Sequence, residues 1–504
     1  MAGAGTDGDG KRAGGDTSLS AAARHESFPR FPFAGKGLKG MIVSGTAVKV
    51  LLLLTLAGLL LRFWHIGDVS FWFDEVVTNS IAHRTVPEIW NAGMYDHNPP
   101  AFYWIEHFML YFGSGETVLR FIPALAGMCT IPVFYLLGKE FHNRTTGILA
   151  AALLTFSAFH INYSQEARPY TLLLFLFSLA LLFYLRAGRT NDPGTWLLSG
   201  LFSALACWSH FFGFVMVLPL VLMACITGYR SGTTLHKDLR PVLRAGAAWF
   251  LLSLPMMIYF VCAGFLQPPE GSWGLKDIHV ITSVLWFQLG QNYLAVILLF
   301  IVFLLGLFRL FRDERDRFFF IVTAMGLPVL TAVIATFRTS IATQHLICLL
   351  PFFFLVTGYC ISSSDRRVCT VRLSCIAVLM MVAISAPSLF WYYSSDTKNG
   401  ENWRDLATEL QKQAGAGDVI LVHKPFYTAA LAYYYHNETE QTFVYGFENR
   451  TRLETLVMQN PARRKILISV GNMTGSRSPG IGPWAKDHAA LLEQRQQLYI
   501  YRVV

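Results

Sequence analysis

Long runs of apolar residues, each close to the length of a membrane-spanning helix, recur along this chain between polar connections. Residues 48–64 and 171–184 are typical examples. A helix needs about 20 such residues to cross the hydrocarbon core of a bilayer. The pattern predicts about eleven spans, at residues 44–64, 118–138, 145–161, 171–186, 194–210, 212–229, 246–265, 292–309, 318–337, 343–362 and 370–391. The predicted fold class is therefore a polytopic α-helical membrane protein.

Basic residues gather in every second connection between these spans. The clusters lie at residues 36–49, 139–144, 186–189, 230–244, 309–317 and 366–372. Cytoplasmic loops carry an excess of Lys and Arg, so this alternation places the N-terminus in the cytoplasm. An odd number of spans then places the residues after the last span on the extracytoplasmic side, together with the longer, more aromatic connections.

The composition agrees with this topology. Of the 504 residues, 53% are hydrophobic and only 14% are charged, whereas about 25% are charged in soluble domains. A net charge of +9 would also suit a nucleic-acid partner. Because the basic residues alternate between connections, they favour membrane topology instead, and we expect no nucleic acid as a partner.

Three regions follow from the pattern. Residues 1–40, rich in Gly, Ala and Ser, are expected to be a disordered cytoplasmic N-terminus. Residues 41–392 form the transmembrane module, with a long first exported loop at 65–117. Residues 393–504 alternate helical stretches (NWRDLATELQKQ, FYTAALAYYY, TRLETLVMQ, WAKDHAALLEQ) with strand-like ones (GDVILVH, TFVYG, KILISVG, LYIYRVV). This order predicts a small extracytoplasmic α/β domain with a mainly parallel sheet, which we expect to support or position a substrate.

Two adjacent carboxylates, Asp74 and Glu75, stand in the stretch FWFDEVV just after the first span. Asp74 is suited to capping the helix that follows, and either acid is also compatible with an ordinary solvated loop. Adjacent residues on a helix do not face the same way, so we expect only one of the two acids to enter a site.

Further polar residues stand at the exported ends of the spans. The stretch YDHNPPAFYW holds Asp96 and His97, and His97 with a nearby acid has the ligand types of a divalent-metal site. A satisfied surface histidine is the alternative. The stretch YSQEARPY brings Gln165, Glu166 and Arg168 to the mouth of the bundle.

Three arginines lie at the exported rim: Arg120, Arg168 and Arg338. Arginine binds phosphate through planar, bidentate contacts. An ion pair of Arg168 with Asp74 or Glu166, and contact of Arg120 and Arg338 with lipid headgroups, are the alternatives. An acid that can take a proton, beside cations that can hold phosphate, is what group transfer from a lipid-phosphate carrier requires.

Four motifs in residues 71–174 (FWFDE, HNPPAFYW, VLRFIPALAG and NYSQEARPYTLL) resemble, in order and spacing, the bacterial relatives of protein O-mannosyltransferases and the lipid A aminoarabinose transferase. These are membrane glycosyltransferases of the GT-C fold. CWSHFFG and RTSIATQHLICLLP are similar to later features of the family. Two departures are Asn98, which stands between His97 and Pro-Pro, and the lack of a counterpart to the second loop acid of the aminoarabinose transferase, which leaves the sugar open.

The resemblance implies a GT-C module that inverts the sugar as it transfers it from a polyprenyl-phosphate carrier to a hydroxyl or amine. The acceptor is a lipid, protein or glycan, and the place is the outer face of a bacterial cytoplasmic membrane. Asp74 corresponds to the general base of the family. The remaining assignments are Arg168, Arg338 and Lys276 for the donor phosphate; Glu75, Glu166, Gln165, Tyr170 and Arg120 for substrate; and His97 and His210 for a divalent metal ion as cofactor.

Two other functions are compatible with the same pattern. A transporter or flippase of a lipid-linked solute needs charged or broken helices at mid-membrane, whereas these acids gather at the exported rim. A non-catalytic subunit that anchors or scaffolds an envelope complex is the other alternative.

Overall fold

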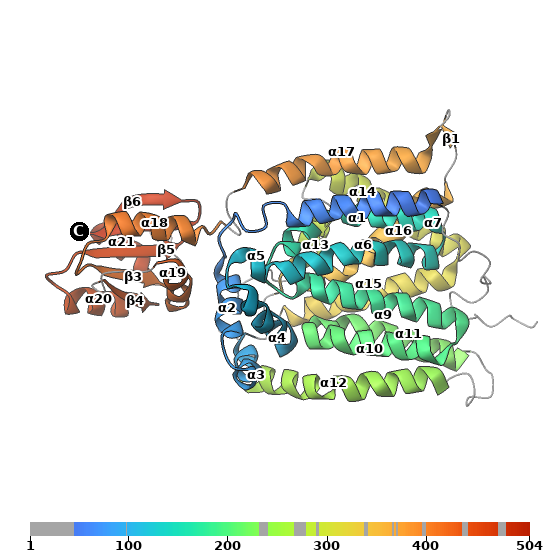
Figure 1. The fold of residues 1–504 in the computed structure, drawn as a ribbon, viewed down its shortest axis with the longest axis horizontal. Helices are drawn as coiled ribbons and strands as arrows, with labels where there is room; N and C mark the ends of the chain where they lie inside the picture. The colour runs from blue at the N-terminus through green and yellow to red at the C-terminus, as the bar shows by residue number, and fades with distance from the viewer. Residues whose placement is uncertain are drawn as a thin grey trace, which may run out of the picture.

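Long helices run back and forth through one bundle, and short helices cap one end of it beside a separate C-terminal domain (Figure 1). The computed structural model describes residues 45–96, 98–230, 240–266, 279–288, 292–336, 341–364, 367–368, 371–395, 400–435, 442–471 and 480–504. The segment 1–40, expected to be disordered, lies outside these residues.

The bundle holds the apolar helices that the sequence predicts. In chain order they are α1 (Gly45–Phe63), α6 (Phe121–Phe141), α7 (Arg144–Thr155), α8 (Ala158–Ser164), α9 (Tyr170–Thr190), α10 (Pro193–Ser209), α11 (Phe212–Arg230), α12 (Arg240–Leu266), α13 (His279–Gln288), α14 (Tyr293–Asp313), α15 (Arg315–Ala335), η2 (Thr343–Leu349), α16 (Leu350–Ser363) and α17 (Leu373–Ser394), with the short strands β1 (Arg367–Val368) and β2 (Val371–Arg372) before α17.

Within the described residues, eight helical stretches are long and apolar enough to cross a membrane, or nine if the bent pair α7 and α8 is one span. The expected multi-pass membrane fold is confirmed. The expected count of eleven spans stays a prediction, because α10 has 17 residues and the apolar part of α11 covers only Phe212–Ile226. Both of these shorter helices nevertheless belong to the bundle (Figure 1), where α10 packs against α9 and α12, and α11 packs against α9 and α15.

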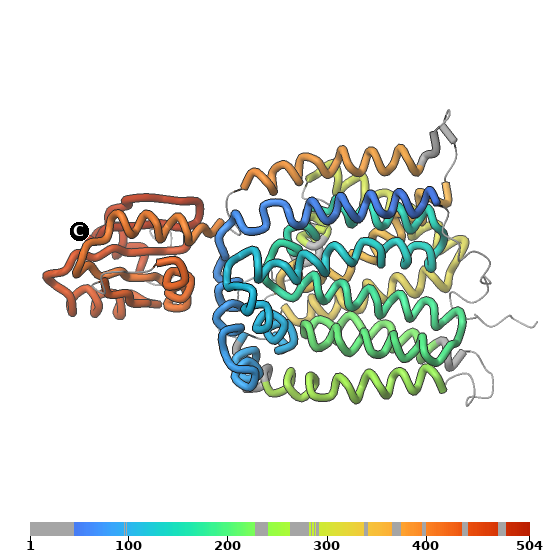
Figure 2. The backbone as a smooth tube through the Cα atoms, viewed as in Figure 1, coloured from blue at the N-terminus to red at the C-terminus, as the bar shows by residue number. Residues whose placement is uncertain are grey.

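Burial follows position in the bundle. Most side chains of α16 are buried, whereas α1 exposes Leu52, Leu53 and Leu56, as a helix facing lipid does. Figure 2 shows α1 and α17, the first and last long helices, along one edge of the bundle. In the interior, α6 and α7 approach closely at Gly138 and Gly147, where a Cβ added to Gly138 would lie 2.5 Å from the Cα of Gly147. Small residues permit such close helix crossings in membranes.

The break between α7 and α8, a bend of 61°, has a specific support. The buried guanidinium of Arg62, at the end of α1, donates to the carbonyl oxygens of Leu154 and Thr155 at 2.9 and 3.4 Å and to His160 Nδ1 at 2.7 Å. It thereby satisfies carbonyl groups that the end of α7 leaves free. The bend directs the segment after α8, which carries Arg168, toward the capped end of the bundle.

The long loop at 65–117, which we expect to be exported, is largely helical. Its elements are α2 (Phe73–Ala82), α3 (Val86–Tyr95), α4 (Pro100–Met109), η1 (Leu110–Phe112) and α5 (Glu116–Leu119). They lie across the end of the bundle that faces the C-terminal domain (Figure 1). Pro99 and Pro100 fit this arrangement, because proline is favoured at the beginning of a helix.

The C-terminal domain is an α/β domain, as expected. It comprises α18 (Trp403–Gln413), β3 (Val419–His423), η3 (Pro425–Tyr427), α19 (Thr428–Tyr434), β4 (Phe443–Phe447), α20 (Arg450–Gln459), β5 (Lys465–Val470), α21 (Ile481–His488), β6 (Ala489–Arg495) and β7 (Leu498–Val503). Its five-stranded sheet has the order β4-β3-β5-β7-β6. Helices cover both faces, and buried side chains of α18 and α19 pack on one of them.

Two details of this domain were predicted wrongly. The sheet is mixed rather than mainly parallel: β3 pairs in parallel with β4 and β5, but β7 is antiparallel to β5 and β6. The second half of WAKDHAALLEQ is strand β6 instead of helix. Pairing with β7 across a tight turn at Gln496, whose φ is +52°, overrides the helix propensity of AALLEQ.

Candidate active site

The adjacent acids Asp74 and Glu75 lie in the first turn of α2, where negative charge is favourable. Successive helical residues are about 100° apart around the axis, so the two carboxylates point in different directions. The side chain of Glu75 is fully buried, whereas that of Asp74 is 30% exposed. Only Asp74 of the two acids is therefore accessible, and the expectation that one of them enters a site stays a prediction.

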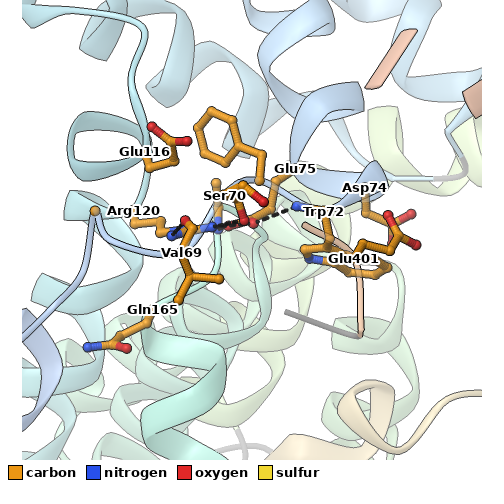
Figure 3. Close-up of polar contacts among 12 residues, drawn as sticks. Val69, Ser70, Trp72, Asp74, Glu75, Glu116, Arg120, Gln165 and Glu401 are labelled. Atoms are coloured by element: carbon orange, nitrogen blue, oxygen red, sulfur yellow. Dashed lines mark hydrogen bonds and ion pairs between the residues drawn. The ribbon is translucent and has the colours of Figure 1, made fainter. Parts of the chain in front are cut away.

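Glu75 is saturated with hydrogen bonds from the protein. Its Oε1 accepts from Arg120 Nε at 2.7 Å and from the Ala167 backbone N–H at 2.8 Å. Its Oε2 accepts from Arg120 Nη2 at 2.6 Å and from the Trp72 backbone N–H at 3.3 Å. Figure 3 shows this pairing, with Asp74 on the other side of the helix turn.

Arg120 is equally engaged. Besides Glu75, its guanidinium donates to the carbonyl oxygens of Ile66, Val69 and Ser70 at 2.7–3.1 Å. Glu75 and Arg120 therefore join α2, the segment before it, the end of α5 and the segment after α8. The structure shows that Glu75 and Arg120 hold each other in place. Their expected role in substrate binding stays a prediction.

Arg168 lies beneath α2 between two other carboxylates. Its Nη1 donates to Asp96 Oδ2 at 3.1 Å, and its Nη2 lies 3.9 Å from Asp74 Oδ2. Asp96, at the end of α3, also accepts from Asn98 Nδ2 at 2.9 Å and from the Tyr103 hydroxyl. The ion pair of Arg168 with Asp74, one of the two alternatives left open by the sequence, is thus present. Arg168 Nε, in contrast, is buried with no hydrogen-bond partner in the described part of the chain.

Asp74 differs from Glu75 and Asp96 in the hydrogen bonding of its carboxylate. Among the described residues, no hydrogen bond reaches either side-chain oxygen, whereas Glu75 and Asp96 each accept at least three. Burial raises the pKa of Asp74 to about 6, against the opposing effect of Arg168. Asp74 therefore combines free lone pairs with increased basicity, as a general base requires.

Aromatic rings lie near Arg168. Tyr170, at the beginning of α9, lies 5.5 Å from the His210 ring and 6.1 Å from the His345 ring, centroid to centroid. Backbone N–H groups of Phe212 and Ala342 donate to Nδ1 of His210 and His345, respectively. Each neutral imidazole must then carry its hydrogen on Nε2. Tyr170, His210 and His345 thus form a ring cluster of hydrogen-bond donors.

The other residues of YSQEARPY hold the segment in place. Gln165 Nε2 donates to the carbonyl oxygens of Arg62 and Trp64 at 3.2 and 2.6 Å, and its Oε1 accepts from the Tyr392 hydroxyl at 2.7 Å. Glu166 is buried. Gln165 therefore ties the segment to α1 and α17, and the substrate role expected for both residues stays a prediction.

Three predicted site residues, His97, Lys276 and Arg338, lie outside the described residues. Within the part that the structure describes, no three His, Cys, Asp or Glu residues are grouped to hold a metal ion. His210 lies in the ring cluster, and its assignment as a metal ligand, like that of His97, remains a prediction.

The structure adds to the site three residues that were not predicted from the sequence. They are Asp96, His345 and Glu401. Asp96 stands directly before His97, the predicted metal ligand. Its position before a Pro-Pro turn is the feature of the sequence that could have identified it as a site residue. His345 stands in a motif of the resemblance. Glu401 comes from the segment before α18, and it accepts hydrogen bonds beside Asp74 (Figure 3).

Comparison with known proteins places these residues in context. Residues 96–259 match the family model described as dolichyl-phosphate-mannose-protein mannosyltransferase. An uncharacterized protein of Aquifex aeolicus (strain VF5) is 28% identical over 160 residues, which are 30% of this chain and 32% of that protein. The chain thus matches about a third of the length of that curated relative. The matched family region includes Asp96, Arg120, Arg168 and His210.

Solved structures match over most of the chain. ArnT from Cupriavidus metallidurans, bound to undecaprenyl phosphate, has a TM-score of 0.57 at 11% identity and covers 92% of this chain and 99% of that one. The archaeal oligosaccharyltransferase AglB from Archaeoglobus fulgidus, in complex with an inhibitory peptide and a dolichol-phosphate, has a TM-score of 0.52 at 13% identity, covering 90% and 74%. The arabinofuranosyltransferase AftD from Mycobacteria has a TM-score of 0.51 at 15% identity, covering 90% and 41%.

These matches define the fold of the protein. The chain is a multi-pass membrane protein with the GT-C fold of membrane glycosyltransferases, and the resemblance drawn from its motifs is confirmed.

Proposed function

We propose that this protein transfers a sugar, with inversion, from a polyprenyl-phosphate carrier to an acceptor hydroxyl or amine. The observation that carries the proposal is the pairing of Asp74, whose carboxylate accepts no hydrogen bond from the described residues, with Arg168, whose buried Nε has no partner among them. One group is suited to taking a proton and the other to holding an anion. The lipid phosphates bound to ArnT and AglB support the class of donor.

The chemistry requires one bond to form as another breaks. Asp74 accepts the proton of the acceptor while the acceptor oxygen or nitrogen attacks the anomeric carbon. The bond from that carbon to the phosphate oxygen breaks, and the polyprenyl phosphate leaves with the bonding electrons. Attack opposite the leaving group inverts the anomeric centre. Arg168 stabilises the negative charge that develops on the phosphate.

The ring cluster lies near Arg168, the proposed ligand of the donor phosphate. The Nε2–H groups of His210 and His345 and the hydroxyl of Tyr170 are uncharged donors suited to phosphate oxygens. We assign these three residues to the donor subsite together with Arg168. Lys276 and Arg338 remain proposed phosphate ligands.

The surroundings of the reaction are part of the proposal. Asp74 and the C-terminal domain lie at the same end of the bundle, which the distribution of basic loops assigns to the extracytoplasmic side of a bacterial cytoplasmic membrane. A divalent metal ion near His97 is a proposed cofactor. The acceptor is a lipid, protein or glycan of the envelope.

Mass spectrometry of envelope lipids, proteins and glycans from a deletion strain tests the proposal. We expect one sugar substituent to be missing, the polyprenyl-phosphate-linked form of that sugar to accumulate, and the wild-type gene to restore both. An envelope with every sugar in place would contradict the proposal. Accumulation of the lipid-linked sugar on the cytoplasmic leaflet alone would favour a flippase instead.

A further inference from the structure

The C-terminal domain is docked on the residues that immediately precede Asp74. The Phe73 ring packs against those of Phe426 and Tyr427, with centroids 5.0 and 5.2 Å apart. The Phe71 backbone N–H donates to the Tyr434 hydroxyl at 2.7 Å. Phe71 also belongs to the same hydrophobic core as the buried residues of α18 and α19. The aromatic residues of FWFDEVV thus fasten α2 to the domain.

One polar contact of this interface reaches the helix that carries Asp74. Glu401 is buried, and its Oε2 accepts from the Phe73 backbone N–H at 3.0 Å and from Trp403 Nε1 at 2.7 Å. Phe73 is the first residue of α2, so its N–H belongs to the group of donors that a helix leaves free at its N-terminus. A carboxylate at this place orients the first turn and interacts favourably with the helix dipole.

Glu401 and Asp74 lie near each other beside Trp72 (Figure 3). The titratable groups that act on or face Glu401 are Asp74 and Glu75 of α2 and Tyr427 of η3. Burial raises the pKa of Glu401 to about 7, and the negative charges of Asp74 and Glu75 contribute in the same direction. Because burial raises the pKa of Asp74 only to about 6, Asp74 loses its proton before Glu401, and Glu401 influences Asp74 through its hydrogen bonds rather than through its charge.

We propose that Glu401 is a positioning residue of the transferase site, supplied by the segment that begins the C-terminal domain. Its carboxyl group accepts from the Phe73 N–H, which fixes the first turn of α2 and with it the place of Asp74. The domain that we expected only to support or position a substrate then completes the catalytic machinery. This inference rests on the proposed role of Asp74.

Glu401→Ala removes the acceptor of the Phe73 N–H, whereas Glu401→Gln keeps it, because an amide oxygen still accepts from Phe73 and Trp403. Glu116→Ala is the matched control. Glu116 also lies at the domain interface, where its Oε1 accepts from the Tyr434 hydroxyl at 2.6 Å and from Arg404, but neither of these bonds involves α2. The variants are made in the full chain.

Transfer of the sugar that the deletion strain lacks, measured in membrane vesicles, separates positioning from folding. We expect kcat to fall about 10–100-fold in Glu401→Ala with KM unchanged, and to stay near the wild-type value in Glu401→Gln and Glu116→Ala. A wild-type kcat in a folded Glu401→Ala protein would overturn the proposal.

A second variant covers the case in which Glu401→Ala does not fold. Glu401→Asp keeps the carboxyl group but shortens its reach to the Phe73 N–H, so we expect kcat to fall about tenfold with the thermal midpoint of unfolding preserved. An unchanged kcat would contradict the positioning role. If Asp74→Asn transfers sugar as well as the wild type, the proposed function itself fails, whereas a wild-type kcat in the Glu401 variants alone overturns only the role of Glu401.

Discussion

Nε and Nη2 of Arg120 donate to the two carboxylate oxygens of Glu75 at 2.7 and 2.6 Å, with both side chains buried. A planar guanidinium bound to a carboxylate by two parallel hydrogen bonds is the strongest arrangement that this pair of residues can make. It is built into the turn that presents Asp74. Glu75, which is held rigidly, and Asp74, the proposed base, are therefore neighbours in the sequence with opposite surroundings.

Glu75→Ala should destabilise the protein by about 3–5 kcal/mol, because the buried charge of Arg120 loses its partner. Thermal unfolding in nanodiscs measures the effect. Asp74→Asn is the control, since no hydrogen bond from the described residues is lost there, and we expect an unfolding midpoint close to that of the wild type. Equal midpoints for Glu75→Ala and the wild type would show that the pair does not support the fold.

Arg168→Gln should lower kcat/KM for sugar transfer by about 10²–10³-fold, the typical cost of removing one group that stabilises a developing anion. Asp96→Asn should have a smaller effect, because Asp96 accepts from Arg168 Nη1 and so aims the guanidinium without contacting the phosphate. Transfer rates in membrane vesicles distinguish the two. A larger loss in Asp96→Asn than in Arg168→Gln would reverse these roles.

Glu106 of α4 offers a test of stability against pH. It is buried, its oxygens have no hydrogen-bond partner among the described residues, and burial raises its pKa well above the usual range. The folded state then binds a proton that the unfolded state releases above about pH 4.3, so ionisation of Glu106 opposes folding as the pH rises.

We expect Glu106→Gln, which cannot ionise, to gain stability relative to the wild type as the pH is raised from 5 to 8. Thermal midpoints at several pH values give the difference. Glu88→Gln on α3 serves as the control, because the bonds of Glu88 to Thr85 lower its pKa. Glu88 is then largely ionised in both the folded and the unfolded state from pH 5 to 8, and its variant should differ from the wild type by a nearly constant amount. A difference between Glu106→Gln and the wild type that stays constant with pH would contradict the raised pKa.

Sugar transfer itself should depend on pH through Asp74. A base acts only when deprotonated, and burial raises the pKa of this carboxyl to about 6. We therefore expect kcat/KM to rise about tenfold per pH unit well below pH 6 and to level off above it. A profile that is flat between pH 4.5 and 7 would exclude a group with this pKa from the step.

Some residues of this site could be predicted from the sequence and others could not, for physical reasons. Asp74 and Arg168 stand in short motifs at the ends of apolar segments, and a charge at such a place is costly unless it has a function. The partner of Phe73 could not be predicted in this way, because Glu401 lies 328 positions further along the chain. The same holds for Glu75 and Arg120, whose mutual pairing depends on how the first loop folds back.

Some elements of the fold could likewise be predicted from the sequence and others could not. Apolar runs predict membrane helices directly, because lipid requires the backbone to satisfy its own hydrogen bonds. Local sequence is a poorer guide for AALLEQ. This run of good helix formers becomes strand β6 because its backbone forms hydrogen bonds with the neighbouring strand β7. Local propensity decides where tertiary pairing is absent, and pairing decides where it is present.

The central claim is that Asp74 takes the proton of the acceptor. The most direct test measures transfer of the sugar that the deletion strain lacks, in vesicles containing Asp74→Asn protein, alongside binding of undecaprenyl phosphate to the same protein. We predict that transfer falls about 10²–10⁴-fold while binding and thermal stability stay close to those of the wild type. Transfer at the wild-type rate by Asp74→Asn would contradict the account.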